Sequence, residues 1–278
     1  MDKEEIGKAI RERYGNIAKQ SSSCCSSAKS CCGSTDSVQS ISRSIGYTEE
    51  ELNAVPEGAN LGLGCGNPIA LVSLKEGETV LDLGSGAGFD CFLAAREVGK
   101  TGKVIGVDMT AEMLERARQN ARKGDFGNVE FRLGEIENLP VGDNQVDIII
   151  SNCVINLSPN KRRVFQEAFR VLRPGGRLMV SDIVLLKDLP EEIKNSVAAY
   201  VGCVAGATTK EDYLETIRGA GFWETKVLGE AAFSVELLAN DPTAVEIAKN
   251  LKLSPERARD LASSVISIKI SAIKPAID

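Results

Sequence analysis

A short apolar run that leads into three closely spaced glycines constrains the fold of this chain more than any other feature. The run covers 80–83, and Gly84, Gly86 and Gly88 follow it directly, before an apolar helix predicted over 90–98. The alternation continues along the chain, with strands predicted at 104–108, 129–132, 146–150 and 177–181 and helices at 110–121 and 161–172. Strands that alternate with helices at this spacing predict an α/β fold, with helices on both faces of a mostly parallel sheet.

The segments on either side of this pattern differ in composition. A short helix is predicted over 2–13, and the Ser-rich stretch 20–44, which carries Cys24-Cys25 and Cys31-Cys32, is expected to be flexible. Further helices are predicted at 48–54, 68–74, 191–200, 210–220, 242–250 and 255–262. Two further strands are predicted at 225–228 and 266–271. We therefore expect an N-terminal segment at 1–45, a central domain at 46–182 and an additional C-terminal α/β region at 183–278.

The composition excludes several kinds of chemistry. The 278 residues include no histidine, so the chain cannot form a Ser-His-Asp or Cys-His nucleophile pair or an imidazole metal site. Its 33 basic and 39 acidic residues give a net charge of −6, which argues against sequence-independent binding to nucleic acid. No window approaches the roughly 18 apolar residues of a membrane span, and the first residues lack the apolar core of a signal peptide. We expect a cytoplasmic protein whose eight cysteines stay reduced and serve as reactive or metal-binding groups.

Polar groups follow the predicted strands at their carboxyl ends, the edge at which parallel sheets bind ligands. Asp82 and the Gly-rich turn end the first strand, where glycines let the backbone approach a ligand closely. Asp108 ends the second strand, and a carboxylate at this position can accept hydrogen bonds from both hydroxyls of a ribose. The third and fourth strands are followed by Glu135-Ile136 and by Asn152. The pattern predicts a nucleoside-containing ligand at this edge.

This combination resembles the class I S-adenosylmethionine-dependent methyltransferases over about 75–182. In that superfamily the Asp-x-Gly-x-Gly-x-Gly turn lines the amino-acid part of the cofactor, the acidic strand end binds ribose, and the loop after the third strand flanks adenine. The dinucleotide fingerprint matches less well, because Phe89 stands where it requires a third glycine. The resemblance implies a Rossmann-like fold, S-adenosylmethionine as cofactor, and a cofactor site formed by Asp82, Gly84, Ser85, Gly86, Gly88, Asp108, Met109, Glu135, Ile136 and Asn152.

Three cysteines lie in predicted loops. Cys65 lies in a Gly-rich turn, Cys153 follows the fourth strand, and Cys203 lies in a loop of small residues beyond the fifth strand. A lone cysteine is most simply explained as a small buried side chain, which is our interpretation of Cys91 on the helix after the Gly-rich turn. Three loop cysteines in a histidine-free chain instead favour a soft, thiophilic ligand.

The motifs around these cysteines resemble the arsenite methyltransferases. The similar segments are Gly64-Cys65-Gly66-Asn67-Pro68, Ser151-Asn152-Cys153-Val154-Ile155-Asn156-Leu157 and the Cys203 loop, and the resemblance extends from the N-terminal cysteines to about Trp223. It implies that Cys153 and Cys203 bind trivalent arsenic, and that Cys65 and an N-terminal cysteine act in the early steps. Cys25 matches the N-terminal position best, with Cys31 and Cys32 as the alternatives, and Tyr47 matches an aromatic residue near the family's arsenic site.

We therefore expect an arsenite methyltransferase, in which Cys65, Cys153 and Cys203 hold arsenic and methyl groups come from S-adenosylmethionine, as in arsenic detoxification. The expected substrates are arsenite and methylated trivalent arsenicals. Because oxidation of arsenic would consume thiols, a cysteine disulfide and an external thiol reductant, such as thioredoxin or a glutathione-like thiol, are expected as well. Two alternatives stay open: a methyltransferase that acts on carbon or sulfur of an organic substrate, and a non-catalytic thiolate metal-binding protein.

Overall fold

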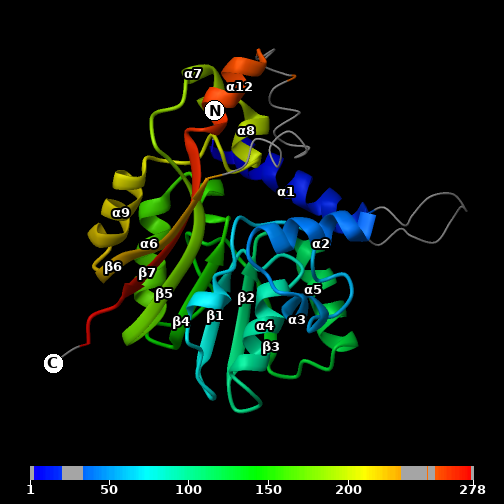
Figure 1. The fold of residues 1–278 in the computed structure, drawn as a ribbon. Coiled ribbons are helices and arrows are strands. Elements are labelled where there is room, and N and C mark those ends of the chain that lie inside the picture. Colours follow the sequence, from blue (N-terminus) through cyan, green and yellow to red (C-terminus); the bar gives the residue numbers. More distant parts are fainter. Residues whose placement is uncertain (1–2, 21–33, 233–248, 250–253, 277–278) are drawn as a thin grey trace, which may run out of the picture.

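The computed structural model describes residues 3–20, 34–232, 249 and 254–276, which form an α/β fold around one sheet (Figure 1). Within these residues the sheet has seven strands, in the order β3-β2-β1-β4-β5-β7-β6. They are β1 Thr79–Leu83, β2 Lys103–Asp108, β3 Val129–Leu133, β4 Val146–Asn152, β5 Leu172–Leu185, β6 Trp223–Ala232 and β7 Val265–Ile273. All pairs among β1 to β5 are parallel, whereas β7 is antiparallel to both of its neighbours. The predicted mostly parallel α/β fold is confirmed.

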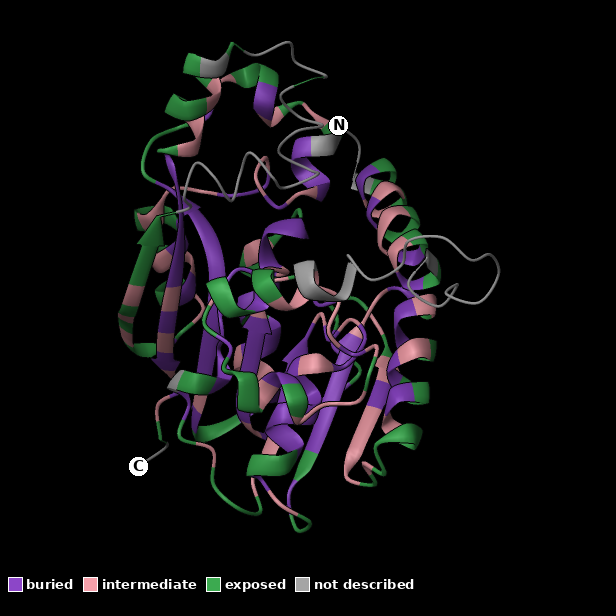
Figure 2. Ribbon diagram, turned by 45° about the vertical axis from the view of Figure 1, so that its right-hand side comes forward, coloured by how far each residue is buried: buried purple, intermediate pink, exposed green. Residues whose placement is uncertain are grey.

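Helices cover both faces of the sheet, which explains the short apolar runs in its central parallel strands β1, β2 and β4. Val80 belongs to a core cluster shared with α3, α4 and α5, and its neighbour Leu81 points to the opposite face, where α6 and α9 pack. These helices are α3 Glu49–Asn53, α4 Phe89–Glu97, α5 Ala111–Lys123, α6 Lys161–Val171 and α9 Lys210–Gly219. Figure 2 shows the buried central strands between the two helix layers, with the exposed residues of β6 at the sheet edge.

The fifth strand is longer than the sequence pattern predicted. We expected the turn Pro174-Gly175-Gly176 to separate a helix from a strand at 177–181, but β5 begins at Leu172 and includes the turn. Two backbone hydrogen bonds explain the difference: the N–H of Gly175 donates to the carbonyl of Lys274 over 2.9 Å, and the N–H of Lys274 donates to the carbonyl of Gly176 over 2.9 Å. The turn is thus part of the strand because it is hydrogen-bonded to Lys274, just beyond β7. Such a long-range interaction cannot be predicted from local secondary-structure propensity.

Three other local predictions are wrong in part. Residues 34–44, expected to be flexible, form helix α2 Ser34–Ser44, in which Ser42 is buried and its hydroxyl donates to Asn60 Oδ1 over 3.0 Å. The single helix predicted over 191–200 is two helices, α7 Glu191–Lys194 and α8 Val197–Val201, because the Ser196 hydroxyl accepts from the N–H of Ala199 and begins a new helix. Thr110 precedes α5 as expected, but its side chain forms no capping bond.

The helix predicted at 68–74 is shorter, a 3-10 turn at Ile69–Leu71, and a second 3-10 turn at Ile155–Leu157 was not predicted. The strand expected at 225–228 extends over Trp223–Ala232, and α12 Pro255–Ala262 lies where a helix was expected. Buried Ile266, Ile268 and Ile270 alternate along β7 as the sequence pattern indicated. The helix predicted at 242–250 lies outside the described residues apart from position 249.

The N-terminal helix α1 Lys3–Gln20 is longer than the segment predicted at 2–13. It packs against α5 and α8 and lies across the carboxyl ends of the strands (Figure 1). The buried side chains of Ile6 and Ile10 join a core cluster with Cys65 and Cys203. Among the described residues, no helix combines the length and the apolar character that a membrane crossing requires.

Candidate active site

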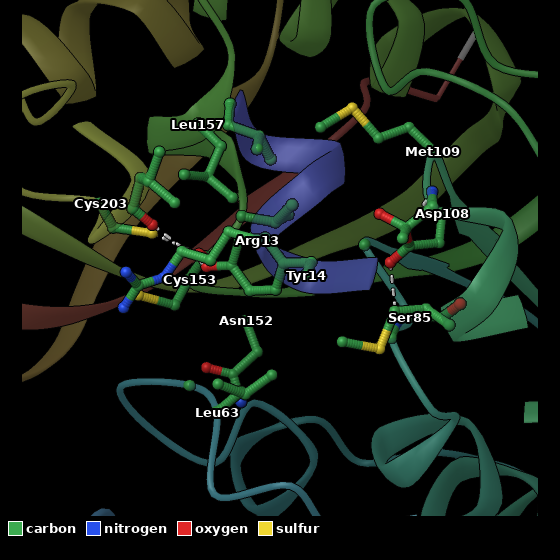
Figure 3. Close-up of a pocket in the computed structure, with 18 of the residues that line it drawn as sticks. Arg13, Tyr14, Leu63, Ser85, Asp108, Met109, Asn152, Cys153, Leu157 and Cys203 are labelled. Atoms are coloured by element: carbon green, nitrogen blue, oxygen red, sulfur yellow. Dashed lines mark hydrogen bonds between the residues drawn. The ribbon is translucent and has the colours of Figure 1, made fainter. Parts of the chain in front are cut away.

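A cavity of 890 Å³ opens at the carboxyl ends of the parallel strands, beneath α1. Figure 3 shows its two ends: Ser85 and Asp108 lie at one, and Cys153 and Cys203 lie at the other. Tyr14 of α1 projects between them. The cavity therefore joins the predicted cofactor residues to the predicted thiols.

The Gly-rich turn at the first end uses its glycines for different purposes. Gly84 has a φ of +69°, and a Cβ built on it would come within 2.4 Å of Val154. Gly86 lines the cavity with a φ of +51°, and a Cβ there would meet no protein atom within 4 Å. Gly88, expected at the cofactor, does not line the cavity. Its lack of a side chain instead leaves room for the rings of Phe92 and Phe131, each of which would lie 2.8 Å from a Cβ built at this position. Of the three glycines, only Gly84 and Gly86 line the cavity.

Asp108 connects the turn to the second strand. Its carboxylate accepts hydrogen bonds from the N–H of Gly86 at 2.9 Å and the N–H of Thr110 at 2.8 Å, while burial raises its pKa. Nearby, the buried Ser85 hydroxyl has no hydrogen-bond partner among the described residues. A ligand with hydroxyl and amine groups would satisfy such atoms, and the open space over Gly86 leaves it room, so these residues fit S-adenosylmethionine.

The other predicted cofactor residues also line the cavity, namely Asp82, Met109, Glu135, Ile136 and Asn152. Asp82 is buried and accepts a hydrogen bond from the thiol of Cys91 at 3.2 Å. Burial raises the pKa of both groups. The Glu135 side chain is 61% exposed, and its carboxylate lies 3.4 Å from the guanidinium of Arg11 on α1. Glu135 therefore forms an ion pair between the cavity rim and α1.

Asn152 is the centre of a partly buried hydrogen-bond network. Its amide donates to Gly66 O at 2.8 Å, to Tyr47 Oη at 2.9 Å and to Asp90 at 3.2 Å, and its Oδ1 accepts from the N–H of Cys65 at 3.0 Å. Tyr47 in turn donates to Asp90 at 2.7 Å, and burial raises the pKa of Asp90 to about 6. Tyr47, expected near the arsenic site, does not line the cavity and instead supports Asn152.

The three loop cysteines meet at the second end of the cavity. Cys153 and Cys203 both have left-handed backbones, with φ of +57° and +64°, and the Cys203 thiol donates to the carbonyl of Cys153 at 3.0 Å. The Sγ atoms of Cys65 and Cys153 lie within 4.8 Å of each other. Contacts with the thiols of Cys203 and Cys65, together with burial, raise the pKa of Cys153. The raised pKa favours the protonated thiol of Cys153 until a ligand displaces the proton.

Several residues around the thiols were missed by the sequence analysis. Tyr14 donates to the carbonyl of Val201 at 3.4 Å and lies next to Cys203, and the spacing of Ile6, Ile10 and Tyr14 along one helix face could have indicated this. Asp182, at the end of the predicted fifth strand, lies behind Cys65 and Cys153. Cys25, Cys31 and Cys32 lie outside the described residues.

Comparison with known proteins agrees with this arrangement. A protein-family model described as a methyltransferase domain matches residues 74–221. A protein named arsenite methyltransferase from Halobacterium salinarum is 47% identical over 283 residues, which cover 100% of this chain and 68% of that protein. This chain belongs to the arsenite methyltransferase family. A human member, also named arsenite methyltransferase, is 35% identical over 228 residues, and the match spans 78% of this chain but only 58% of the human protein.

A solved structure extends the comparison to three dimensions. CrArsM, an arsenic(III) S-adenosylmethionine methyltransferase from Chlamydomonas reinhardtii, superimposes with a TM-score of 0.63 at 32% identity, covering 84% of this chain and 74% of the algal one. The shared fold is the class I methyltransferase fold predicted from the sequence. Within the arsenite methyltransferase family, the match supports S-adenosylmethionine as the methyl donor.

Proposed function

We propose that this chain transfers methyl groups from S-adenosylmethionine to trivalent arsenic held by the thiolates of Cys65, Cys153 and Cys203. The observation that carries the proposal is the single cavity beneath α1, which has the Gly-rich turn at one end and these three thiols at the other. A donor and a thiophilic acceptor could then meet within one enclosed space. The names of the related proteins support the same reaction.

The cofactor end fits its proposed ligand through backbone and carboxylate groups. Gly84 and Gly86 have no side chains that would block a ligand at the turn. Asp108 offers its carboxylate to the ribose, and Ser85 offers its hydroxyl to the amino-acid part. When bound, S-adenosylmethionine supplies an electrophilic methyl group on a sulfonium sulfur. The residues of this end need only bind and orient it, because displacement at a methyl carbon requires alignment and exclusion of water more than proton transfer.

The thiol end fits arsenite by exchange of ligands. Each thiol replaces one hydroxyl of arsenous acid: a sulfur–arsenic bond forms, an arsenic–oxygen bond breaks, and the thiol proton leaves with the hydroxyl as water. Three such exchanges give a pyramidal arsenic tris-thiolate that keeps its lone pair. The net exchange consumes and releases no proton, so the chain needs no histidine, and soft thiolates favour arsenic over harder solutes.

Turnover needs a source of electrons. Donation of the arsenic lone pair to a methyl group raises arsenic from the trivalent to the pentavalent state, and formation of a disulfide from two of its thiolates returns it to trivalent. An external thiol reductant, thioredoxin or a glutathione-like thiol, then restores the two thiols. We propose an N-terminal cysteine, Cys25 or else Cys31 or Cys32, as a further participant in the early steps.

Serine variants assayed with two substrates test this assignment. Arsenite has three exchangeable hydroxyls and methylarsonous acid has two, so Cys153 and Cys203 suffice for the second substrate. We expect Cys153→Ser and Cys203→Ser to abolish methylation of both, because a hydroxyl is a poor ligand for a soft centre. Cys65→Ser should block arsenite methylation while sparing much of the reaction with methylarsonous acid. The measurement is chromatographic separation of arsenic species after incubation with a thiol and methyl-labelled S-adenosylmethionine.

The buried Cys91 provides the matched control, because its thiol contacts Asp82 and lies outside the thiol end. Cys91→Ser should bind arsenite as the unsubstituted chain does. Retention of either activity by Cys153→Ser, or equal loss of both by Cys65→Ser, would contradict the division of roles. A methyltransferase for organic substrates would instead keep its activity in all three cysteine variants.

A further inference from the structure

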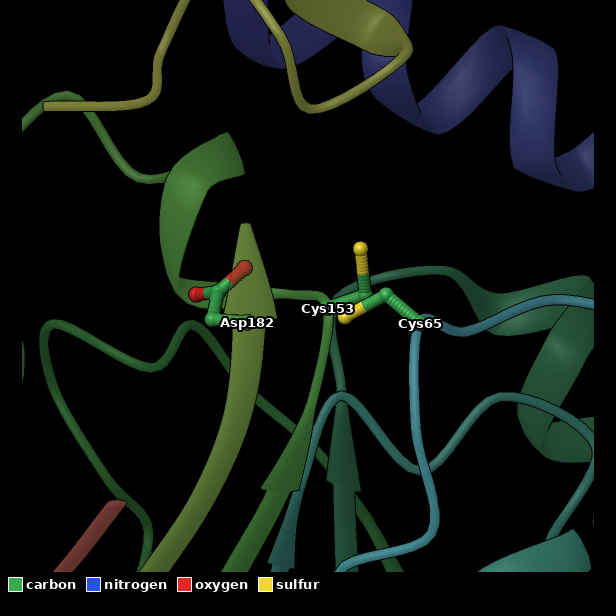
Figure 4. Close-up of side chains that lie close together, drawn as sticks. All are labelled: Cys65, Cys153 and Asp182. Atoms are coloured by element: carbon green, nitrogen blue, oxygen red, sulfur yellow. The ribbon is translucent and has the colours of Figure 1, made fainter. Parts of the chain in front are cut away.

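Asp182 is a buried carboxyl group close to the thiols that the proposed reaction does not use. It lies on β5 with no exposed surface, and Figure 4 shows it beside Cys65 and Cys153, which come from two other segments. One carboxylate oxygen of Asp182 and the Sγ atoms of the two cysteines all lie within 4.8 Å of one another. A buried carboxylate beside one buried and one half-buried thiol is a donor set that arsenic does not require.

The geometry of these three groups is close to that of a tetrahedral metal site. With zinc–sulfur and zinc–oxygen distances of about 2.3 and 2.0 Å, tetrahedral ligands lie about 3.8 Å apart for two sulfurs and about 3.5 Å apart for sulfur and oxygen. The observed upper limit of 4.8 Å exceeds these values by roughly 1 Å. Rotation of the thiols toward a bound ion could close this gap without a change of fold.

Hydrogen bonds fix the carboxylate of Asp182, and one of its oxygens can still accept a further partner. Its Oδ1 accepts hydrogen bonds from the amide of Asn156 at 2.9 Å and the N–H of Ile183 at 2.8 Å, and its Oδ2 accepts one from the hydroxyl of Tyr213 at 2.9 Å. A carboxylate oxygen has two lone pairs, so Oδ2 can accept one more partner. Such supporting hydrogen bonds orient the ligands of established metal sites.

We propose that Cys65, Cys153 and Asp182 form a binding site for a thiophilic divalent cation of the Zn²⁺ or Cd²⁺ type, with its fourth position facing the cavity. Both cysteines line the cavity and Asp182 does not, so a cation would enter from the cavity and meet the carboxylate behind the thiols. The two thiols release their protons to solvent as the ion binds. Because the cation and arsenic share two thiolates, each excludes the other, and the cation inhibits methylation by competition.

Cobalt spectroscopy can test the site without any methyltransferase assay. The full chain would carry serine at Cys24, Cys25, Cys31 and Cys32, since these pairs could bind metal themselves. Titration of the reduced protein with Co²⁺ alone should show one tetrahedral ion with sulfur-to-cobalt charge transfer, displaced by Zn²⁺ and by arsenite. Cys153→Ser should abolish the charge-transfer band, whereas Cys91→Ser should keep it.

Two further substitutions separate coordination by Asp182 from structural support. Asp182→Asn should weaken cation binding by more than the 10- to 100-fold that loss of an outer-shell partner costs, and should leave arsenite affinity unchanged. Tyr213→Phe removes only such an outer-shell hydrogen bond and keeps the carboxylate, so its loss of Co²⁺ affinity should stay within that range and below the loss in Asp182→Asn. Equal Co²⁺ affinity in Asp182→Asn and the parent, equal weakening in the two variants, or an octahedral cobalt spectrum would overturn the site. The proposed methylation is tested separately, because none of these outcomes depends on S-adenosylmethionine.

Discussion

The two ends of the cavity are built in different ways. The cofactor end takes its residues from three segments, 84–87, 108–110 and 134–136, which lie at the carboxyl ends of the adjacent parallel strands β1, β2 and β3. The thiol end takes Cys65 from a turn before the first strand, Cys153 from the end of β4 and Cys203 from the segment after α8. Local turn chemistry is therefore enough for the first end, whereas the second exists only after the whole sheet has formed.

One contact between the ends joins Gly84 of the cofactor turn to Val154, the neighbour of Cys153. A Cβ at Gly84 would come within 2.4 Å of the Val154 side chain, so this glycine sets how closely the two ends approach. If the ends are independent, substitutions should affect one ligand at a time. If they are coupled through this contact, a substitution at Gly84 should affect both ligands.

The largest effect is expected for Gly84→Ala, compared with Gly86→Ala. Both residues have left-handed backbones, which costs alanine about 1–2 kcal/mol, but only Gly84→Ala also overpacks Val154, which adds about 1–3 kcal/mol. Denaturant unfolding should therefore show a loss of roughly 2–5 kcal/mol for Gly84→Ala and about 1–2 kcal/mol for Gly86→Ala.

Binding measurements complete this comparison. Gly84→Ala should weaken the binding of both arsenite and S-adenosylmethionine. Gly86→Ala, whose added methyl group meets no protein atom, should weaken the binding of S-adenosylmethionine alone. Unchanged arsenite affinity in Gly84→Ala would show that the two ends are independent at this contact.

Asp90 gives a pH dependence to the network that supports both ends. Burial raises its pKa from 3.8 to about 6, so the folded state holds a proton that the unfolded state releases. The resulting stabilisation is fully present below pH 4 and is lost as the pH rises through 6, a change of roughly 3 kcal/mol for about two pKa units. Urea unfolding from pH 4 to 7 should show the unsubstituted chain losing about this much relative to Asp90→Asn. Parallel stability curves for the two proteins would mean that Asp90 titrates normally.

Asp108→Ala should act on the cofactor end alone. Loss of hydrogen bonds to a charged group should weaken S-adenosylmethionine binding by roughly 1.5–3 kcal/mol, while arsenite binding stays nearly constant because Asp108 lies at the opposite end of the cavity (Figure 3). Calorimetry with each ligand measures both effects, and Asp108→Asn, which keeps one carbonyl oxygen, should lose less. Equal cofactor affinity in the alanine variant and the parent would remove Asp108 from the ribose site.

The smallest effect is expected for Glu135→Gln. Glu135 and Arg11 form an exposed ion pair across 3.4 Å between the cavity rim and α1, and exposed pairs contribute about 0–1 kcal/mol. Unfolding free energy should therefore change by less than about 1 kcal/mol, with Arg11→Gln as the matched partner variant. A marked loss of S-adenosylmethionine affinity in Glu135→Gln alone would instead assign this carboxylate to the cofactor.

The contrast between the ends matches what sequence analysis could and could not predict. Gly84, Gly86 and Asp108 line the cavity at the sheet edge that the sequence pattern indicated, because a βα turn is encoded within a few adjacent residues. Gly88 fits the same motif but serves packing against Phe92 and Phe131, a distinction that needs the positions of side chains from other elements. Asn152 was expected at the cofactor, and it also links Cys65 to Asp90 and Tyr47.

The amino-acid sequence alone determined the α/β order, the carboxyl edge as the binding edge, and the three loop cysteines as candidate ligands, because hydrophobic period, glycine placement and thiol chemistry are local properties. Only the tertiary structure decided that these thiols meet, that α1 covers them and that Asp182 lies behind them. Cys65 and Ser267, whose hydroxyl donates to the Cys65 carbonyl at 2.7 Å, are 202 positions apart in the chain. Contacts over such separations arise from sheet pairing and layer packing, and no short window of sequence contains them.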